Sequence, residues 1–386
     1  MSASTLTTEI SLPAAPAKAR GKRLIELDVL RGFLLVWMTL THLPTHASVF
    51  SNQTFGFVSA AEGFIFLAGF MIGQLEQRIE EKAGRRATIR DVSRRTLRIY
   101  LYHGALLVFA FTIVAAVGIS FQRLAFQNLL NYYLQKPSEA VVAAALLEYR
   151  PSLLDILPMY IVFMIFTPLA RAIARRWSWK PVIAISFAVW VAAQFGIRHW
   201  LYQQGNFFGL PVPENATGSF NLYGWQLLWM AGLALGSTTP LRSASIRFPR
   251  WLIVTSCTLA IAFFVLRHSP ADQWMNADLY GRLVDKWQLG PVRIVNFSAL
   301  AIVLVRFGGV LARSRPLLPF ASLGQASLEV FCVHVVFCLA GIALSPDADP
   351  VLPAWQQICL LILTMSALFA TAYIVRRHRQ RKPASS

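Results

Sequence analysis

The chain has 386 residues, of which 56% are apolar and only 14% are charged, and its formal net charge is +18. A soluble chain has about a quarter of its residues charged, so the composition excludes an ordinary soluble protein and predicts a polytopic membrane protein. The four cysteines lie in apolar segments without the spacing of metal ligands or of a disulfide framework, so no metal site is expected.

The chain begins with residues 1–23, a segment rich in Ser, Thr, Ala and Pro. This segment has no apolar core of the kind found in signal peptides, so a flexible cytoplasmic tail is expected there. Ten apolar stretches follow, and each is long enough to cross the hydrocarbon core of a bilayer. They occupy residues 28–46, 56–76, 97–119, 153–173, 179–197, 221–238, 250–267, 291–311, 319–344 and 352–376.

These stretches predict one all-α membrane domain over residues 24–376, a bundle of about ten transmembrane helices. A basic cytoplasmic tail is expected over residues 377–386. Within the domain, segment 122–150 has two shorter apolar stretches that predict an amphipathic or a re-entrant pair of helices. The pairs Gly69–Gly73 and Gly232–Gly236 have the small-residue spacing of closely packed membrane helices, so packing is expected there.

The positions of Lys and Arg predict the orientation of this bundle. With the N-terminus in the cytoplasm, 28 of the 36 Lys and Arg residues fall in segments on the inner side and 8 in segments on the outer side. This asymmetry agrees with the positive-inside rule and places both termini in the cytoplasm. Because topology explains most of the positive charge, nucleic acid is not expected as a partner.

The first predicted span carries two basic side chains on one face. From Leu27 to Leu43 it is apolar apart from Asp28, Arg31, two threonines and His42. Arg31 and His42 are eleven positions apart, close to three full turns, so they share one stripe about 16 Å apart along the axis. Ionisable side chains inside a membrane are costly and indicate a functional site by default. The alternative is an Arg that reaches the interface and a His that bonds a neighbouring helix.

Three titratable residues of different spans are predicted to lie at one depth. At 1.5 Å per residue, His42 lies about 21 Å along the first span and Glu62 about 10 Å below the outer surface. His334 lies about 22 Å along the ninth span. All three are therefore expected in the outer half of a hydrocarbon core about 30 Å thick. Three separate structural hydrogen bonds are the alternative explanation.

A group of arginines precedes the third span on the predicted cytoplasmic side. Arg90, Arg94 and Arg98 share one helix face, and Arg95 lies next to it. Guanidinium groups bind phosphates through two parallel hydrogen bonds, so this run predicts a site for a cytosolic phosphate-rich ligand. Topological charge and the binding of lipid headgroups are the alternatives.

At these residues the sequence resembles known families. The motif Leu27–Asp28 with Arg31–Gly32, separated from His42 by ten residues, resembles the membrane acyltransferase 3 family. The Arg95–x–x–Arg98 pair resembles it as well, and so do three ninth-span motifs, Leu323–Gly324, Ser327–Leu328 and His334. Ala68 stands where many members of that family have Ser, so no role is assigned to it.

A narrower resemblance is to the OpgC-type succinyltransferases of osmoregulated periplasmic glucans, and it covers about residues 24–345. The stretches that carry it are 55–64 (FGFVSAAEGF), 154–160 (LDILPMY), 225–228 (WQLL) and 285–293 (DKWQLGPVR). It implies transfer of an acyl group, succinyl, from a cytosolic acyl-CoA to hydroxyls of a periplasmic glucan, in the bacterial inner membrane. Succinyl-CoA would be a co-substrate, no tightly bound cofactor is implied, and membrane lipid surrounds the protein.

The resemblance also implies roles for particular residues. Because acyl-CoA cannot cross lipid, Arg31, Arg95 and Arg98 would bind its phosphates from the inside. His42 is the first candidate for the general base that a sugar hydroxyl needs near neutral pH. Glu62 could orient the imidazole, as the carboxylate of a catalytic triad does.

His334 could polarise the thioester carbonyl or bond the acceptor. Direct transfer and a transient acyl-histidine both fit these residues. Outer-loop aromatic residues that could stack on sugar rings are Tyr132, Tyr133, Trp274 and Trp287. Further candidate site residues are Asp28, Asp155, Gln226, Arg293 and Glu329.

Two other functions remain open at this point. A proton-coupled sugar transporter or flippase would also use Arg, His and Glu inside helices, although paired broken helices in two matching halves are not visible in the sequence. An O-acetyltransferase of another envelope polysaccharide or lipid would use the same mechanism.

Overall fold

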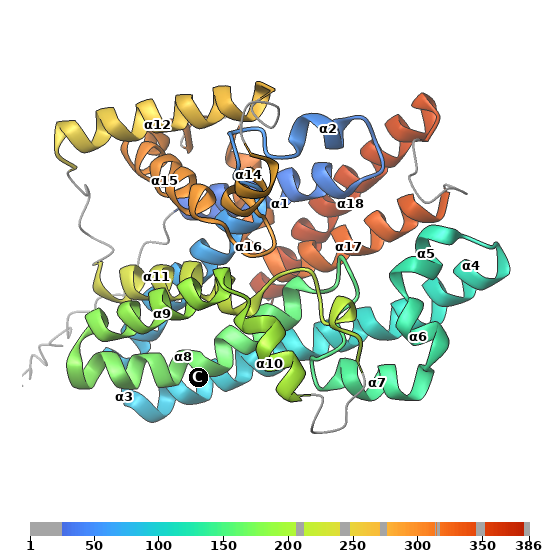
Figure 1. The fold of residues 1–386 in the computed structure, drawn as a ribbon, viewed down its shortest axis with the longest axis horizontal. Helices are drawn as coiled ribbons and strands as arrows, with labels where there is room; N and C mark the ends of the chain where they lie inside the picture. The colour runs from blue at the N-terminus through green and yellow to red at the C-terminus, as the bar shows by residue number, and fades with distance from the viewer. Residues whose placement is uncertain are drawn as a thin grey trace, which may run out of the picture.

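The computed structural model describes residues 25–205, 212–239, 248–270, 276–312, 314, 317–344 and 352–381. All regular elements in these ranges are helices, which confirms the all-α prediction (Figure 1). The tail predicted over residues 1–23 lies outside the described residues. The last helix continues to Arg381, so residues 377–381 of the predicted C-terminal tail belong to it.

The helices of the first half include one very long element. They are α1 (Ile25–His42), α2 (Ala47–Ser51), α3 (Ala60–Phe109), a π-helical turn (Ala110–Val114), α4 (Ala115–Ser120), α5 (Leu124–Leu129), α6 (Asn131–Gln135), α7 (Pro137–Ala145), α8 (Ile156–Trp177), α9 (Trp179–Gln194) and α10 (Ile197–Gly205). Within α3, Gly84 has non-helical dihedral angles (φ 77°, ψ 178°), so a kink divides this helix into two arms, residues 60–83 and 85–109.

The second half has fewer short helices. Its helical elements are a 3₁₀ turn (Glu214–Ala216), α11 (Leu222–Thr238), α12 (Arg250–His268), α14 (Ala277–Val284), α15 (Pro291–Ala312), α16 (Leu318–Gln325), α17 (Ser327–Leu344) and α18 (Ala354–Arg381). α16 and α17 are separated at Ala326, in the middle of the single span predicted over 319–344.

Among the described residues, six helices are long and apolar enough to cross a membrane, or seven if α9 and α10, which meet at 83°, form one span. The predicted count of about ten is therefore not confirmed. The continuous Ala60–Ser120 segment covers two of the predicted spans. α1 carries three charged residues, Glu26, Asp28 and Arg31, in its 18 positions, and α11 has only 17 residues.

Segment 122–150 forms three short helices, α5, α6 and α7, in place of the predicted pair. In Figure 1 they lie together with α4 at one end of the molecule. Stacked aromatic rings hold this region together: Tyr133 lies face to face with Phe111 at 4.2 Å, and Tyr132 meets the edge of Tyr149 at 5.2 Å. At five to nine residues, none of these helices is long enough to cross a bilayer.

Glycines allow two close helix contacts in the bundle. Gly69 and Gly73 of α3 face α11, and Gly232 and Gly236 of α11 face α3, so a Cβ at any of them would collide with the neighbouring backbone. The predicted packing role of these pairs is confirmed. Gly32 of α1 likewise lies against the Phe320 carbonyl of α16. This second contact places the charged start of α1 beside the break between α16 and α17.

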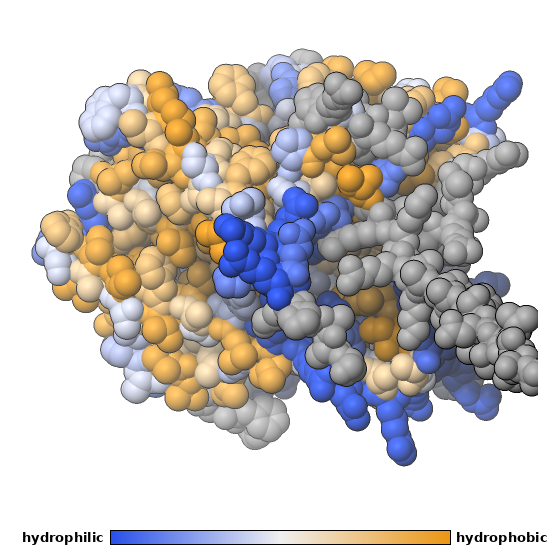
Figure 2. Space-filling model, turned by 180° about the vertical axis from the view of Figure 1, so that it is seen from behind, coloured by the Kyte–Doolittle hydropathy of each residue, from blue (hydrophilic) through white to orange (hydrophobic). Residues whose placement is uncertain are grey.

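The surface that remains exposed is strongly apolar. Figure 2 shows hydrophobic side chains spread over much of the face seen from behind. Phe195 is 86% exposed, Trp251 68% and Trp355 67%. Soluble proteins rarely expose apolar surface on this scale, and hydrocarbon chains of a bilayer can cover it. Together with the apolar helices, this surface identifies a membrane protein.

Candidate functional site

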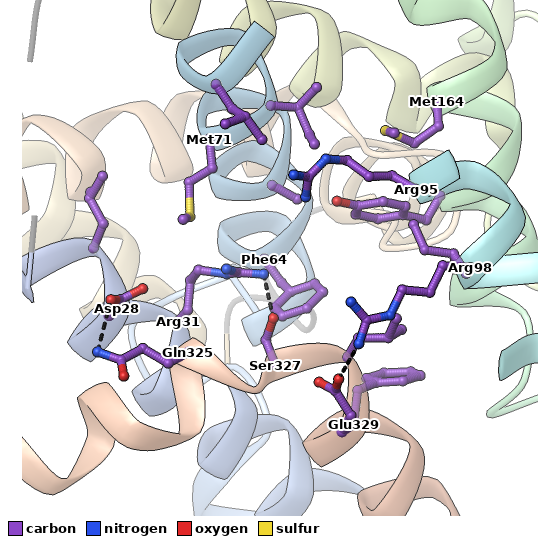
Figure 3. Close-up of a pocket in the computed structure, with 18 of the residues that line it drawn as sticks. Asp28, Arg31, Phe64, Met71, Arg95, Arg98, Met164, Gln325, Ser327 and Glu329 are labelled. Atoms are coloured by element: carbon purple, nitrogen blue, oxygen red, sulfur yellow. Dashed lines mark hydrogen bonds and ion pairs between the residues drawn. The ribbon is translucent and has the colours of Figure 1, made fainter. Parts of the chain in front are cut away.

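A cavity of about 560 Å³ lies between α1, both arms of α3, α8, α17 and the end of α18 (Figure 3). All three predicted donor-binding arginines, Arg31, Arg95 and Arg98, line it. Two of the further candidates, Asp28 and Glu329, line it as well. The structure thus brings together five predicted residues that come from three helices far apart in the sequence.

The sequence alone does not point to six other polar residues in the wall of the cavity: Gln74, Arg78, Tyr160, Gln325, Ser327 and Arg379. Ser327 was visible only as part of a family motif. Arg379 was counted as topological charge in a tail, but α18 continues far enough to carry it to the cavity. Five arginines and two acidic residues therefore line the described part of the cavity, which gives it an excess of positive charge.

Short polar contacts hold several of these side chains in place. Arg31 donates to the Ser327 hydroxyl, and the Gln325 amide donates to Asp28 at 3.2 Å (Figure 3). Glu329 accepts from Arg98 at 2.5 Å and is 2.9 Å from Arg379. Glu329 therefore joins two arginines from different helices on one side of the cavity.

The rest of the lining is apolar. Most of it comes from the first arm of α3 and from α8, with one ring contributed by α17: Phe64, Ala68, Met71, Ile72, Ile156, Leu157, Met164 and Phe331. Arginines and an apolar wall in one cavity suit a ligand that has both anionic groups and a thin neutral chain.

Two of the three residues predicted at one depth are neighbours. The imidazole rings of His42 and His334 lie with their centroids 5.7 Å apart, at an angle of 46°. His334 is 2% exposed, and its Nδ1 is 3.4 Å from the Cys338 sulfur. The buried Nδ1 of His42 has no hydrogen-bond partner among the described residues. One nitrogen of the pair is thus buried and unbonded at the end of α1.

Glu62 has other partners. It accepts from Nε of Arg293 at 2.8 Å and from the backbone N–H of Ser59 at 3.0 Å. The Ser59 hydroxyl also donates to it at 2.5 Å. Ser59 and Glu62 form a capping box at the start of α3, in which the Ser59 side chain accepts from the Glu62 backbone N–H and the Glu62 carboxylate accepts from the Ser59 backbone N–H. Within the described part of the chain, Glu62 makes no hydrogen bond to His42. The structure thus places Glu62 in a buried ion pair with Arg293, itself one of the further candidates.

Two aromatic rings lie between the cavity and the histidines. Phe64 and Phe331 both line the cavity and stack on each other, with centroids 6.3 Å apart and an interplanar angle of 26°. Phe331 in turn lies 5.6 Å from the His334 ring. Both phenyl rings are buried. They therefore separate the arginine-lined cavity from the histidine pair in this conformation.

The remaining candidates lie outside the cavity. Asp155, which precedes α8, is buried and accepts from the backbone N–H of Ser219 at 3.1 Å. Gln226 of α11 exchanges two hydrogen bonds with Ser186 of α9, at 2.6 and 2.7 Å. Both contacts join neighbouring parts of the fold, so neither residue is brought to the candidate site.

Of the predicted sugar-stacking side chains, Tyr132 is buried and Tyr133 is covered by Phe111. Trp274 lies outside the described residues. Trp287 keeps 45% of its surface exposed. Among the described residues, no group of three or more His, Cys, Asp or Glu side chains is placed to hold a metal ion.

Comparison with known proteins gives one finding. The sequence matches the family model described as OpgC protein over residues 23–380, which includes every site residue discussed above. No curated protein and no solved structure matches the chain. The narrower of the two resemblances is confirmed, and the resemblance to the acyltransferase 3 family stays a prediction.

Proposed function

The chain belongs to the OpgC protein family, and from this premise we propose that it is a transmembrane O-acyltransferase of the bacterial inner membrane. It moves an acyl group, succinyl, from cytosolic acyl-CoA to a hydroxyl of a periplasmic glucan. Family membership supports a transferase that modifies glucans with acyl groups. The donor, the direction of transfer and the acyl group are parts of the proposal.

The acyl-CoA site is supported by the convergence of five arginines in the lining of one cavity that also has an apolar wall. Acyl-CoA has phosphates at one end and a thin, mostly neutral arm that ends in the thioester. Guanidinium groups bind phosphates with charge-assisted, bidentate hydrogen bonds. A cavity of about 560 Å³ is also within the range of known small-molecule sites.

The orientation of the bundle follows from the Lys and Arg asymmetry. With the start of α1 on the cytoplasmic side, the arginine-lined cavity faces the cytosol. The histidine pair then lies towards the periplasmic side, where a glucan can reach it. The anionic donor never has to cross the hydrocarbon core, which would be costly for its phosphates.

In the proposed reaction, the thioester arm passes Phe64 and Phe331 and presents its carbonyl carbon at His42. The acceptor hydroxyl oxygen attacks this carbon while the His42 imidazole takes the hydroxyl proton. A carbon–oxygen bond forms, the carbon–sulfur bond breaks, and the departing thiolate receives the proton from the imidazolium. His334 hydrogen-bonds the acceptor or polarises the carbonyl.

A transient acyl-histidine on His42 would fit the same residues, with the sugar hydroxyl attacking in a second step. Glu62 acts differently from the triad carboxylate that the sequence suggests. Because it is bonded to Arg293 and Ser59, it fixes the start of α3 beside α15 and acts as a positioning residue.

The test uses purified full-length protein, succinyl-CoA labelled in its acyl group, and neutral glucan. We expect label on the sugar and release of one CoA thiol for each acyl group transferred. Labelled acetyl-CoA run in parallel identifies an acetyltransferase. Failure to label sugar with either donor, together with glucan uptake into proteoliposomes, would contradict the proposal and identify a transporter.

A further inference from the structure

Two arginines of the cavity meet at one carboxylate, and with it they form what we call the two-arginine cluster: Arg98, Arg379 and Glu329. Nη2 of Arg98, from the second arm of α3, is 2.5 Å from Oε1 of Glu329 (Figure 3). Nη2 of Arg379, near the end of α18, is 2.9 Å from the same oxygen. Because one atom accepts from both guanidinium groups, the two groups are close enough to bind one ligand group together.

The two-arginine cluster keeps donors and an acceptor for a ligand. Nη1 of Arg379 donates to the Gln325 carbonyl at 2.7 Å, which fixes this side chain at the end of α16. Nε of Arg379, and Nε and Nη1 of Arg98, make no hydrogen bond within the described part of the chain. Glu329 is 9% exposed, and its second oxygen, Oε2, is buried without a hydrogen-bond partner among the described residues. A buried acceptor without a partner is costly unless a ligand completes it.

The cluster lies on the solvated side of the cavity. The side chains of Arg98 and Arg379 keep 53% and 45% of their surface exposed. Arg31 is half-buried and reaches into the middle of the cavity (Figure 3). Arg95 is 44% exposed, but its Nε pairs with Asp91 at 2.6 Å. A ligand that enters from the aqueous side therefore meets the cluster before it meets Arg31.

The chemical groups of an acyl-CoA follow a fixed order. The thioester is at one end, the pantetheine arm and the pyrophosphate follow, and the ribose at the other end carries a 3′-phosphate beside its 2′-hydroxyl. In the proposed reaction the thioester passes Phe64 and Phe331, so the ribose stays on the solvated side of the cavity. The 3′-phosphate is a monoester with a charge of about −1.5 to −2 and three terminal oxygens. Two adjacent guanidinium groups match this group better than the singly charged phosphates of the pyrophosphate.

We propose that Arg98 and Arg379 bind the 3′-phosphate of the acyl-CoA donor, and that Oε2 of Glu329 accepts from the neighbouring 2′-hydroxyl. This inference rests on the proposed use of acyl-CoA and identifies the part of the donor that is recognised on the solvated side of the cavity. Thioesters without the 3′-phosphate, including those on a carrier protein, leave both guanidinium groups without their ligand. Sites built to bond a polar group reject analogues that lack it, so the cluster selects free acyl-CoA.

The experiment measures equilibrium binding of CoA and of 3′-dephospho-CoA, which differ only in this phosphate, to purified full-length protein in nanodiscs of neutral lipid. The wild-type protein should bind CoA at least about tenfold more tightly. Arg379→Gln should weaken CoA binding about fivefold, a moderate loss because the side chain is partly solvated. The same variant should change the affinity for 3′-dephospho-CoA by less than about twofold, which also shows that it is folded.

Two further variants act as controls. Arg377→Gln makes the same change two positions earlier on α18, at an exposed arginine that does not line the cavity, and it should alter the affinity for neither ligand. Arg31→Gln should weaken both ligands by the same factor, because Arg31 lies further in, towards the pyrophosphate. Equal affinity of the wild-type protein for both ligands would overturn the 3′-phosphate subsite. Equal losses for both ligands in Arg379→Gln, or a loss confined to CoA in Arg31→Gln, would contradict the assignment to the cluster.

A third arm distinguishes a lipid headgroup as the source of the phosphate. Binding is measured again in nanodiscs that contain phosphatidylglycerol, where the preference for CoA should persist. Loss of the preference in these nanodiscs alone would mean that a headgroup occupies the cluster, which contradicts the assignment.

Transfer of label from succinyl-CoA to glucan is measured on the same preparations. Transfer by a protein that binds CoA and 3′-dephospho-CoA equally would overturn the subsite and leave the proposed function in place. The expected preference for CoA without any transfer would contradict the proposed function and leave the subsite in place. A wild-type protein that does not bind CoA would contradict both.

Discussion

The arginine-lined cavity and the histidine pair differ in how replaceable their residues are. In the cavity, Arg95 and Arg98 keep 44% and 53% of their side-chain surface exposed, and three further arginines are nearby. At the histidine pair, His334 is 2% exposed and faces one other imidazole. Several partly solvated cations can share the binding of phosphates. A single buried base has no substitute.

This difference separates binding from chemistry. Loss of one guanidinium from an exposed group removes part of an attraction that its neighbours also supply. In the proposed reaction, loss of the His42 imidazole removes the group that takes the proton. Changes in the cavity should therefore appear mainly in KM for the donor, and changes at the pair should appear in kcat.

The largest expected effect is at His42. We expect His42→Ala to lower kcat by about 10²-fold or more, because a general base is removed. His199→Ala is the matched control, since His199 is an exposed histidine paired with Glu214. Initial rates of transfer and thermal unfolding are measured for both. A His42→Ala protein that is active but unfolds at lower temperature would make His42 a structural residue.

The next effect is on stability at Glu62. Glu62→Gln should destabilise the fold by about 3–5 kcal/mol, because it leaves the buried Arg293 charge without its carboxylate. Glu62→Gln combined with Arg293→Gln should recover part of this loss. Thermal unfolding of purified protein provides the measurement. A fully stable Glu62→Gln variant with low kcat would instead support the orienting role that the sequence suggests.

Smaller changes are expected in the cavity. Arg95→Gln and Arg98→Gln should each raise KM for acyl-CoA about fivefold. The rise is smaller than the loss of a buried charge-assisted hydrogen bond would cause, because both side chains are partly solvated. KM for the acceptor should not change. Arg94→Gln is the control, since Arg94 is exposed next to Arg95 but does not line the cavity. Equal effects at all three positions would mean that the run only sets topology.

The boundary between the two regions should give the smallest effect. Phe331→Ala opens the ring stack between the cavity and the histidines, so water should reach the thioester more often. We expect hydrolysis of acyl-CoA in the absence of glucan to rise a few-fold. Phe166→Ala, at an exposed phenyl of α8, should leave hydrolysis unchanged. If Phe331→Ala does not raise hydrolysis, the two rings are only packing.

The sequence predicts which side chains come together in those cases where membrane depth and charge are enough to determine the contact. Orientation and phosphate chemistry placed Arg31, Arg95 and Arg98 together, and equal depth placed His42 near His334. Depth fixes the height of a residue but not the direction in which its helix face points. Glu62 was therefore matched with His42, whereas its partner is Arg293, 231 positions further along the chain.

Other features could not be predicted from the sequence because they depend on where helices begin and end. Arg379 reaches the cavity only because α18 continues past the apolar stretch to Arg381. The break at Ala326 places Ser327 at the start of α17, beside Arg31. Counting apolar residues does not detect either feature. It predicts one unbroken span where the structure has α16 and α17, and a separate tail where α18 continues to Arg381.

In the proposed function, donor and acceptor reach the protein from opposite sides of the membrane. Sealed vesicles of known orientation are loaded with glucan, and labelled succinyl-CoA is added outside. Vesicles with the cytoplasmic face outward should label the enclosed glucan, and vesicles of the opposite orientation should not until they are opened with detergent. Labelling only in the opposite orientation would contradict the account, because the arginine-lined cavity would then open to the periplasm.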